Sequence, residues 1–209
     1  MNYQRTHALF EKAYSEYQIQ VKDHACLRVL WNNLAKVDDY GKCYRSGHPS
    51  RILLKRVQRL GVRHIISLRG GKVLPHNLRE RALCSKMGLS YYNVPMSSGR
   101  PPSRATLEKL VELYESLDEP FLVHCKTGAD RTGLAVGVYH LAMLRSVTKK
   151  AQKQLDIRFL HLGLGRKKML RKFFEFYEKT NPDHIPFKVW LQSNYTKDRF
   201  VQYLSCEDR

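Results

Sequence analysis

The residues best suited to chemistry lie together between His124 and Gly133, in the order His-Cys-Lys-Thr-Gly-Ala-Asp-Arg-Thr-Gly. The Cys125 thiol becomes a strong nucleophile once it loses its proton. Arg131, six positions later, carries a planar fork of N–H donors that can hold a phosphate through two bonds, which the point charge of a lysine cannot. The types and spacing of these residues predict the attack of a thiolate on a bound phosphoryl group.

These groups need a tight loop between a strand and a helix to hold them. Phe121–Val123 predicts a short buried strand, and the apolar stretch Leu134–Leu144 has the length of a helix. The start of a helix offers unpaired backbone N–H groups and the positive end of its dipole to an oxyanion. Gly128 and Gly133 permit backbone conformations and close approaches that larger residues hinder. In such a site a thiol pKa falls from about 8.5 to about 3.5–7.5, so we expect Cys125 to be a thiolate at neutral pH.

Cys125 has three other interpretations. A single cysteine at a strand end is usually a small buried hydrophobe. A loop of this kind could also capture phosphate without turnover, but such a module would be expected to lose either Cys125 or Arg131. A rhodanese-like sulfur carrier also places a cysteine in a loop that begins a helix, but the spacing of Arg131 and the pair Thr132-Gly133 favour phosphoryl chemistry. The coincidence of several rare residues therefore favours catalysis.

The stretch His124–Gly133 resembles, at all ten positions, the HCxxGxxR[ST]G signature of the cysteine-dependent protein tyrosine and dual-specificity phosphatases. The segments Tyr44–Ser50 and Ile65–Arg69 are more loosely similar to the early strands of compact, atypical dual-specificity phosphatases. Those relatives include bacterial forms and enzymes that act on inositol pyrophosphates. Together the resemblance spans roughly Tyr44–Leu144.

The resemblance implies a role for each residue of the loop. Cys125 would attack phosphorus to form a phosphocysteine, and Arg131 would hold the equatorial oxygens. Thr132 would ease release of the thiolate, and His124 would orient the loop and tune the thiol, its alternative being a core histidine. Arg69, past the end of a predicted strand, is a second candidate phosphate contact, with a surface arginine as the alternative. The predicted phosphate-binding set is Lys126, Thr127, Gly128, Ala129, Asp130 and Arg131.

The family also implies a general acid, which protonates the leaving group and typically contributes about 10²–10⁴-fold. In many relatives it is an aspartate on a separate mobile loop, but the corresponding segment here, Val94–Arg100, contains no carboxylate. We expect Asp130 to act as the acid and as the base that activates water, as in the myotubularin-like variant of the signature. The alternative for Asp130 is a side chain that caps the following helix. Asp118 is a weaker candidate because it precedes a strand, at the opposite end of the sheet.

The pattern along the chain predicts the α/β fold class. Helical spacing at Ser50–Leu60, Asn77–Met87 and Ser103–Leu117 alternates with β-rich runs at Val62–Leu68, Leu89–Met96 and Phe121–Val123. Gly61 and Gly88 are placed to end two of the helices, and Ser103 to cap the third. Strands separated by helices pair in parallel, so we expect a central, mostly parallel sheet flanked by helices, with the phosphatase loop between a strand and a helix.

Beyond Leu144 the chain predicts a helical C-terminal part, with helices at Thr148–Leu160, Gly165–Lys179 and Phe187–Leu204. Leu170, Phe173, Phe174 and Tyr177 are spaced for one buried face. The 209 residues fit a single phosphatase domain, with a catalytic core at about 24–145 and a helical extension at about 146–209.

The net charge of +18 predicts an anionic partner. Arg145–Lys172 contributes ten lysines and arginines against one acidic residue, Asp156. We expect a phosphorylated substrate, either a phosphoprotein, a phosphoinositide or an inositol polyphosphate, and no nucleic acid, because no nucleic-acid motif is found. The cluster Arg166–Lys168 would suit peripheral membrane contact or only water.

The remaining features concern location and cofactors. No run of about 18 apolar residues could cross a bilayer, and Met1–Lys22 lacks the apolar block of a secretory signal, so we expect a cytoplasmic protein. The cysteines show none of the paired spacings of a zinc site or a disulfide framework, and we expect reduced thiols and no metal. They are Cys26, Cys43, Cys84, Cys125 and Cys206. A thiolate mechanism needs no cofactor.

Overall fold

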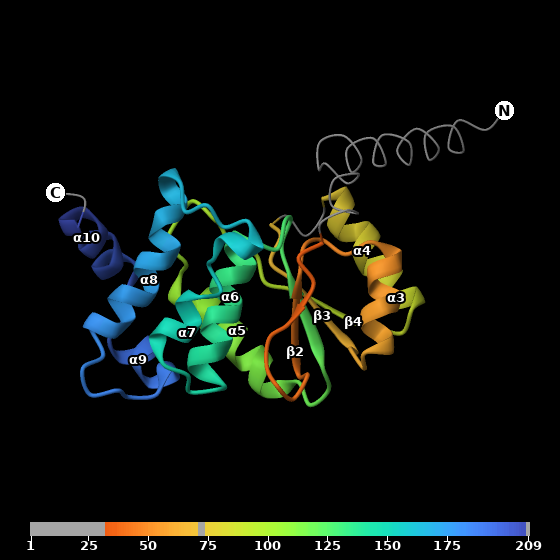
Figure 1. Cartoon of the computed structure of the whole chain (residues 1–209), viewed down its shortest axis with the longest axis horizontal. Coiled ribbons are helices and arrows are strands. Elements are labelled where there is room, and N and C mark those ends of the chain that lie inside the picture. The colour runs from red at the N-terminus through yellow and green to blue at the C-terminus, as the bar shows by residue number, and fades with distance from the viewer. Residues whose placement is uncertain (1–31, 71–73, 208–209) are drawn as a thin grey trace.

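The computed structural model describes residues 32–70 and 74–207, which form an α/β fold around a mostly parallel sheet (Figure 1). The strands are β1 Ala35–Lys36, β2 Cys43–Ser46, β3 His64–Ser67, β4 Ser90–Asn93 and β5 Phe121–His124. They lie in the order β1-β2-β5-β3-β4. The short β1 runs antiparallel to β2, and the other pairings are parallel. The predicted fold class is confirmed, and β1 and β2 extend the sheet beyond the three predicted strands.

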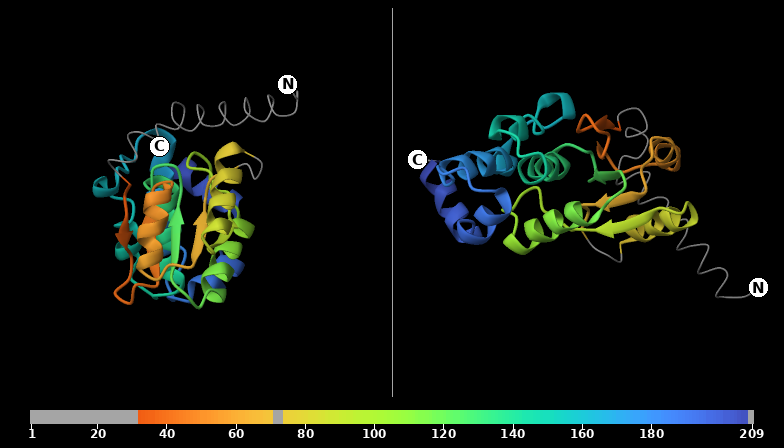
Figure 2. Two further views of the ribbon diagram at one scale, coloured as in Figure 1. Left: turned by 90° about the vertical axis from the view of Figure 1, so that its right-hand side faces the viewer. Right: turned by 90° about the horizontal axis from the view of Figure 1, so that it is seen from below.

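Helices cover both faces of the sheet (Figure 2). They are α3 Arg51–Arg59 and α4 Pro75–Lys86 on one face, and α5 Arg104–Ser116 and α6 Asp130–Ala142 on the other. Successive strand residues point to opposite faces. Ile65 and Leu122 accordingly pack with α3 and α4, whereas Ile66 and Val123 belong to the core under α5 and α6. Because both faces are covered, β3 and β5 read as continuous buried runs instead of alternating ones.

The predicted helix ends are confirmed at three positions. The Ser103 side chain accepts a hydrogen bond from the backbone N–H of Thr106 at 3.1 Å, and α5 begins at the next residue. Gly61 and Gly88 adopt positive φ angles of 91° and 67° just beyond α3 and α4. Glycine adopts this conformation without the steric cost that other residues incur.

The C-terminal part is helical as predicted, but its helices are shorter. They are α7 Thr148–Gln152, η2 Ile157–Phe159, η3 Gly165–Lys167, α8 Lys168–Lys179, α9 Phe187–Ser193 and α10 Lys197–Glu207. The predicted helix Thr148–Leu160 is wrong beyond Gln152, because the carbonyl of Gln154 accepts from the buried Arg45 instead of a later helical N–H. The predicted helix Phe187–Leu204 is two helices, because the chain turns where Tyr195 is buried and donates to the Pro102 carbonyl at 2.6 Å.

One apolar core joins the sheet to α5, α6 and α8–α10. Leu170, Phe173 and Phe174 are buried in it, as the sequence predicts. In residues 32–70 and 74–207 no helix is both long and apolar enough to cross a membrane. The predictions for Met1–Lys22 and Cys26 lie outside the described residues.

Candidate active site

The loop that carries Cys125 leaves β5 at the carboxyl end of the parallel strands and enters α6 (Figure 1). Helix α6 begins at Asp130, four residues before the predicted Leu134. The backbone N–H of Gly133 already bonds to the carbonyl of Ala129 at 2.9 Å. Asp130 and Arg131 therefore stand in the first turn of the helix, where the positive end of the dipole attracts anions.

Cys125 is buried at the base of this loop, and the backbone N–H of Gly128 donates to its Sγ at 3.3 Å. Burial acts to raise the thiol pKa, but the charge of Arg131 and hydrogen bonds from Thr132 and Gly128 outweigh it. The pKa of Cys125 is therefore below its ordinary value, in the direction expected for a nucleophilic thiolate.

The two glycines of the loop are required by space. Gly128 has a φ angle of 78°, and a Cβ atom there would lie 2.6 Å from the backbone N of Gly47. A Cβ atom at Gly133 would lie 2.6 Å from the carbonyl oxygen of Gln154. The predicted need for close approach is confirmed at both positions.

Arg131 is half-buried, and its Nη1 donates to the Leu68 carbonyl at the end of β3, at 3.4 Å. Thr127 is exposed, and its carbonyl accepts from Asn33 Nδ2 at 2.8 Å. Lys126 is half-buried and Ala129 is buried. The loop is thus fixed by its neighbours on both sides of Cys125, with Arg131 beside β3.

A buried group of side chains lies on the inner side of the loop, and we call His48, Glu80 and His124 the inner cluster. Nε2 of His124 lies 2.8 Å from Oε1 of Glu80, and its Nδ1 lies 3.1 Å from the Cys125 carbonyl. A carbonyl and a carboxylate are both hydrogen-bond acceptors, so each ring nitrogen of His124 faces an acceptor. The inner cluster brings its donor atoms within 4.8 Å of one another, as a metal site does. The contacts of Glu80 with both histidines also bring these atoms together.

Glu80, from α4, supplies the counter-charge of this cluster. Burial acts to raise its pKa, but the charges of His124, His48 and Arg69 keep it below its ordinary value. His48 Nδ1 lies 3.7 Å from the second carboxylate oxygen. The predicted phosphate contact Arg69 is buried at the carboxyl end of β3 and acts on Glu80, and its contact with phosphate stays a prediction.

A second group lies on the outer side of the loop, and we call Asp130, His161 and Lys167 the outer cluster. Oδ1 of Asp130 accepts from His161 Nδ1 at 2.8 Å, and Oδ2 lies 2.9 Å from Lys167 Nζ. Burial acts to raise the pKa of Asp130, but these two partners hold it below its ordinary value. In the resting protein Asp130 is therefore a carboxylate.

A third support lies beneath the loop. Arg45, from β2, is buried and donates to the Gly128 carbonyl at 2.7 Å and to Gln154 at 2.9 and 3.0 Å. Its guanidinium stands 3.5 Å from the centre of the Phe159 ring. Burial lowers the pKa of Arg45 to about 9, although the charge of Cys125 acts in the opposite direction.

Comparison with known proteins places this geometry in a family. Residues 29–169 match the family PTP-NADK, described as a DSP-PTPase phosphatase fused to NAD+ kinase. The chain belongs to this phosphatase family. The predicted resemblance to atypical, cysteine-dependent dual-specificity phosphatases is confirmed.

Individual relatives agree with this assignment. Inositol diphosphatase DSP4 of Arabidopsis thaliana is 24% identical over 168 residues, which cover 78% of this chain and 81% of that protein. The core catalytic domain of the PP-IP phosphatase SIW14 from S. cerevisiae has a TM-score of 0.56 at 23% identity, over 85% of this chain and 94% of that one. P. aeruginosa TpbA in complex with pTyr has a TM-score of 0.54 at 20% identity, over 68% and 90% of the two chains. The solved structures share the fold.

For a phosphatase of this family, sequence reasoning missed several residues that shape the site. They are Arg45, His48, Glu80, His161 and Lys167, which reach the loop from distant parts of the chain. Arg45 and His48 lie in the segment that resembles the family, which was the one available signal. No local pattern marks Glu80 or His161, because a single polar residue on a helix or loop is expected to be exposed to solvent.

The other acid candidates fall where the sequence predicts. Asp118 precedes β5, and its carbonyl accepts from the Lys42 ammonium at the amino end of the sheet. It lies at the opposite end of β5 from Cys125. Val94–Arg100 follows β4 and brings no carboxylate to the loop. Asp130 is therefore the carboxylate that the catalytic loop itself carries.

Proposed function

We propose that the chain is a cysteine-dependent phosphatase that works through a phosphocysteine on Cys125. The observation that carries this proposal is the buried Cys125 thiol under the Gly128 N–H, with its pKa lowered by Arg131. A buried thiol without such partners would keep a raised pKa and would remain inert.

The reaction would proceed in two displacements. The Cys125 thiolate attacks phosphorus, the bond from phosphorus to the leaving oxygen breaks, and the leaving group takes its electron pair and a proton. Arg131 and the N–H groups of the loop hold the charge of the equatorial oxygens. Water then attacks the phosphocysteine, the phosphorus–sulfur bond breaks, and inorganic phosphate leaves as the thiolate is restored.

Asp130 is the proposed proton carrier. As a carboxylate held by His161 and Lys167, it fits the second step, in which it would take a proton from the attacking water. It could return that proton to a leaving group in the next cycle. Its lowered pKa makes this acid role weak in the first step.

A site with a base but only a weak acid suits a polyanionic inositol phosphate as substrate, with a phosphorylated protein or lipid as the alternatives. Relatives are named as an inositol diphosphatase and a PP-IP phosphatase. When Cys125 takes the terminal phosphoryl group of a diphosphate, the leaving group is the phosphate that stays on the inositol ring, which needs little protonation. A phosphotyrosine releases a phenolate, whose conjugate acid has a pKa of about 10. The net charge of +18 also favours a polyanion. Phosphotyrosine is the second candidate substrate, because the similar structure of TpbA is a complex with pTyr.

Phosphate release by the full chain tests this proposal. Inositol pyrophosphates, inositol polyphosphates, phosphoinositides and phosphotyrosine peptides would be compared, with Cys125→Ser in parallel. We expect turnover that is highest on inositol pyrophosphates and absent in Cys125→Ser. Activity that survives in Cys125→Ser, or no turnover on any substrate, would contradict the mechanism.

A further inference from the structure

Four aliphatic side chains in the segment that contacts the Cys125 loop are exposed to solvent. Ile157, Leu160, Leu162 and Leu164 are 63%, 49%, 61% and 66% exposed, and we call them the apolar fringe. His161, between two of them, points the other way and is buried against Asp130. The buried His161 anchors the segment, and this anchor leaves its neighbours Leu160 and Leu162 facing solvent.

The segment of the fringe is fastened to the catalytic loop. His161 and Lys167 both hold Asp130, the first residue of α6. The amide of Asn33 donates to the carbonyls of Thr127 and Phe159 at 2.8 and 3.0 Å and so joins the loop to η2. Whatever the fringe contacts is therefore brought next to Cys125, at the carboxyl end of the sheet (Figure 1).

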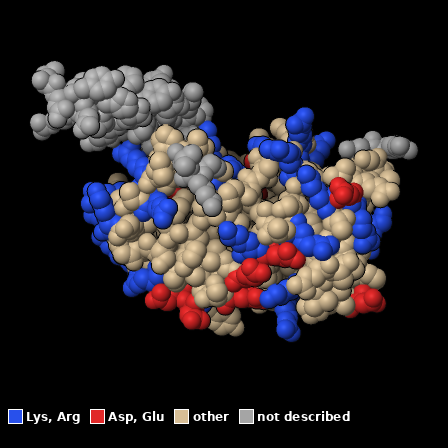
Figure 3. Space-filling model, turned by 180° about the vertical axis from the view of Figure 1, so that it is seen from behind, with Lys and Arg blue, Asp and Glu red and all other residues tan. Residues whose placement is uncertain are grey.

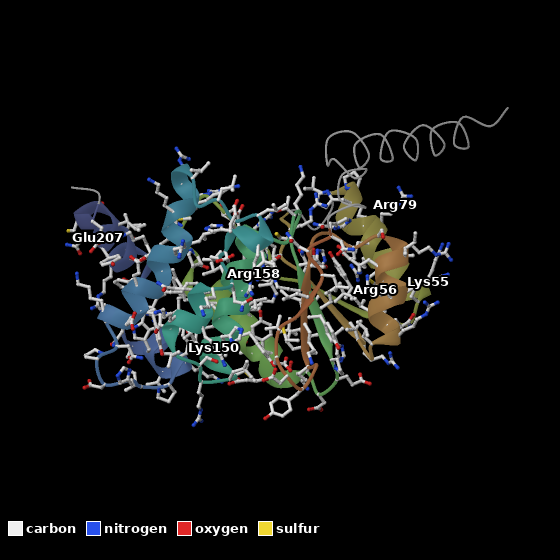
Figure 4. All side chains as sticks on the ribbon, in the orientation of Figure 1. Lys55, Arg56, Arg79, Lys150, Arg158 and Glu207 are labelled. Carbon is white, nitrogen blue, oxygen red and sulfur yellow. The ribbon has the colours of Figure 1, made fainter. Side chains whose placement is uncertain are left out.

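Basic side chains accompany the fringe. Arg158, Arg166 and Lys168 are exposed, and no acidic residue occurs from Ile157 to Phe174. Figure 4 places Arg158 where the helical C-terminal part meets the sheet. Figure 3 shows lysine and arginine along the upper edge of the molecule and the acidic residues mostly in its lower half. Asp156 caps η2 and Asp130 pairs with Lys167, but four lysines and arginines from Arg158 to Lys168 leave the surroundings of the fringe with a net positive charge.

We propose that the apolar fringe and its basic neighbours dock the protein on an anionic lipid bilayer. Aliphatic side chains enter the boundary between headgroups and acyl chains, and lysine and arginine bind anionic headgroups. If the fringe bound a protein partner, we would expect it to contain aromatic residues, because leucine is under-represented among the residues that dominate protein interfaces. The fringe is aliphatic and protruding, so the bilayer is the occupant that its chemistry fits.

Binding of the purified full chain to vesicles tests the proposal without any turnover. Phosphatidylcholine vesicles would be compared with vesicles that also contain phosphatidylglycerol, by sedimentation at two salt concentrations. We expect binding that requires the anionic lipid and weakens as salt rises. Leu162→Glu with Leu164→Glu should abolish it, and Arg166→Ala with Lys168→Ala should weaken it by about twentyfold or more, at roughly fivefold for each charge.

Two matched variants control for site and charge. Tyr40→Glu removes an exposed apolar side chain near the amino end of the sheet, and Lys55→Ala with Arg56→Ala removes two charges from α3, away from Arg158 in Figure 4. Both should bind vesicles nearly as the wild type does. Hydrolysis of a small soluble phosphomonoester by every variant would show that the fold and the Cys125 site are intact.

The outcomes separate the occupants. No binding to either kind of vesicle overturns the proposal and leaves a protein partner for the fringe. Equal binding to neutral and anionic vesicles overturns the role of the basic side chains. Vesicle binding by a chain without turnover would leave the docking standing while the proposed function fails.

Discussion

On the inner side of the catalytic loop a histidine is paired with a glutamate, and on the outer side an aspartate is paired with a histidine. His124 and Glu80 are completely buried and joined at 2.8 Å, and Asp130 and His161 are joined at the same distance but beside the exposed Lys167. A charge buried without its partner is far more costly than one that water can reach. The buried inner pair should therefore contribute mainly to stability, whereas the outer pair, which water can reach, should allow Asp130 to exchange its proton.

The largest expected effect is on the inner side. Glu80→Gln keeps the shape of the side chain but removes the buried carboxylate that faces His124 and His48. We expect a loss of about 3–5 kcal/mol in the free energy of unfolding, measured by urea denaturation.

A matched control exists on the surface. His64 and Glu119 also form a histidine–glutamate pair, at 3.3 Å, but the Glu119 side chain is 59% exposed. Glu119→Gln should change the free energy of unfolding by less than about 1 kcal/mol. Equal losses in the two variants would contradict the claim that burial distinguishes the inner cluster.

The next effect concerns the proton carried by Asp130. Asp130→Asn should slow hydrolysis of phenyl phosphate and of a nitrophenyl phosphate by a similar factor, about 100-fold, because in both cases the water that attacks the phosphocysteine loses its base. Steady-state rates on a series of aryl phosphates measure these losses. Asp118→Asn, at the other end of the sheet, should leave every rate unchanged. A loss much larger for phenyl phosphate than for a nitrophenyl phosphate would contradict the base role and make Asp130 mainly the acid.

A smaller effect should divide the two partners of Asp130. His161 is buried and Lys167 is half-exposed, so His161→Gln should cost about 1–3 kcal/mol in unfolding free energy and Lys167→Ala at most about 1. Thermal or urea unfolding of both variants measures the difference. A larger loss for Lys167→Ala would mean that the outer cluster is held mainly by charge at the surface.

The smallest effect is the dependence of stability on pH. The pKa values of Glu80 and Asp130 are lowered in the folded protein, so their contribution is fully present above their unfolded values of about 4 and is lost as the pH falls through the folded ones. The difference in unfolding free energy between the wild type and Glu80→Gln should not shrink from pH 7 to 5 and should shrink below about pH 4. A difference that shrinks between pH 7 and 5 would contradict the lowered pKa of Glu80.

Local patterns were enough to predict much of the fold. The caps and glycines at Ser103, Gly61 and Gly88 act on neighbouring residues, so their effects can be read without the rest of the chain. Strand β2 was indicated only by the resemblance of Tyr44–Ser50 to an early strand of the family, because its local pattern contains Arg45, and a buried arginine is expected to be exposed until its partners are known. The helix at Phe187 was predicted too long, since only the burial of Tyr195 turns the chain there.

The sequence by itself determined the candidate catalytic loop, because Cys125, two glycines and Arg131 lie within ten consecutive residues whose geometry is local. The partners of that loop were decided by the tertiary structure alone. Glu80 on α4 and His161 beyond η2 meet His124 and Asp130 only after the chain has folded, and nothing near them in the sequence marks the contact. These hydrogen bonds depend on distances between residues far apart in the sequence, and those distances are set only when the helices pack on the sheet.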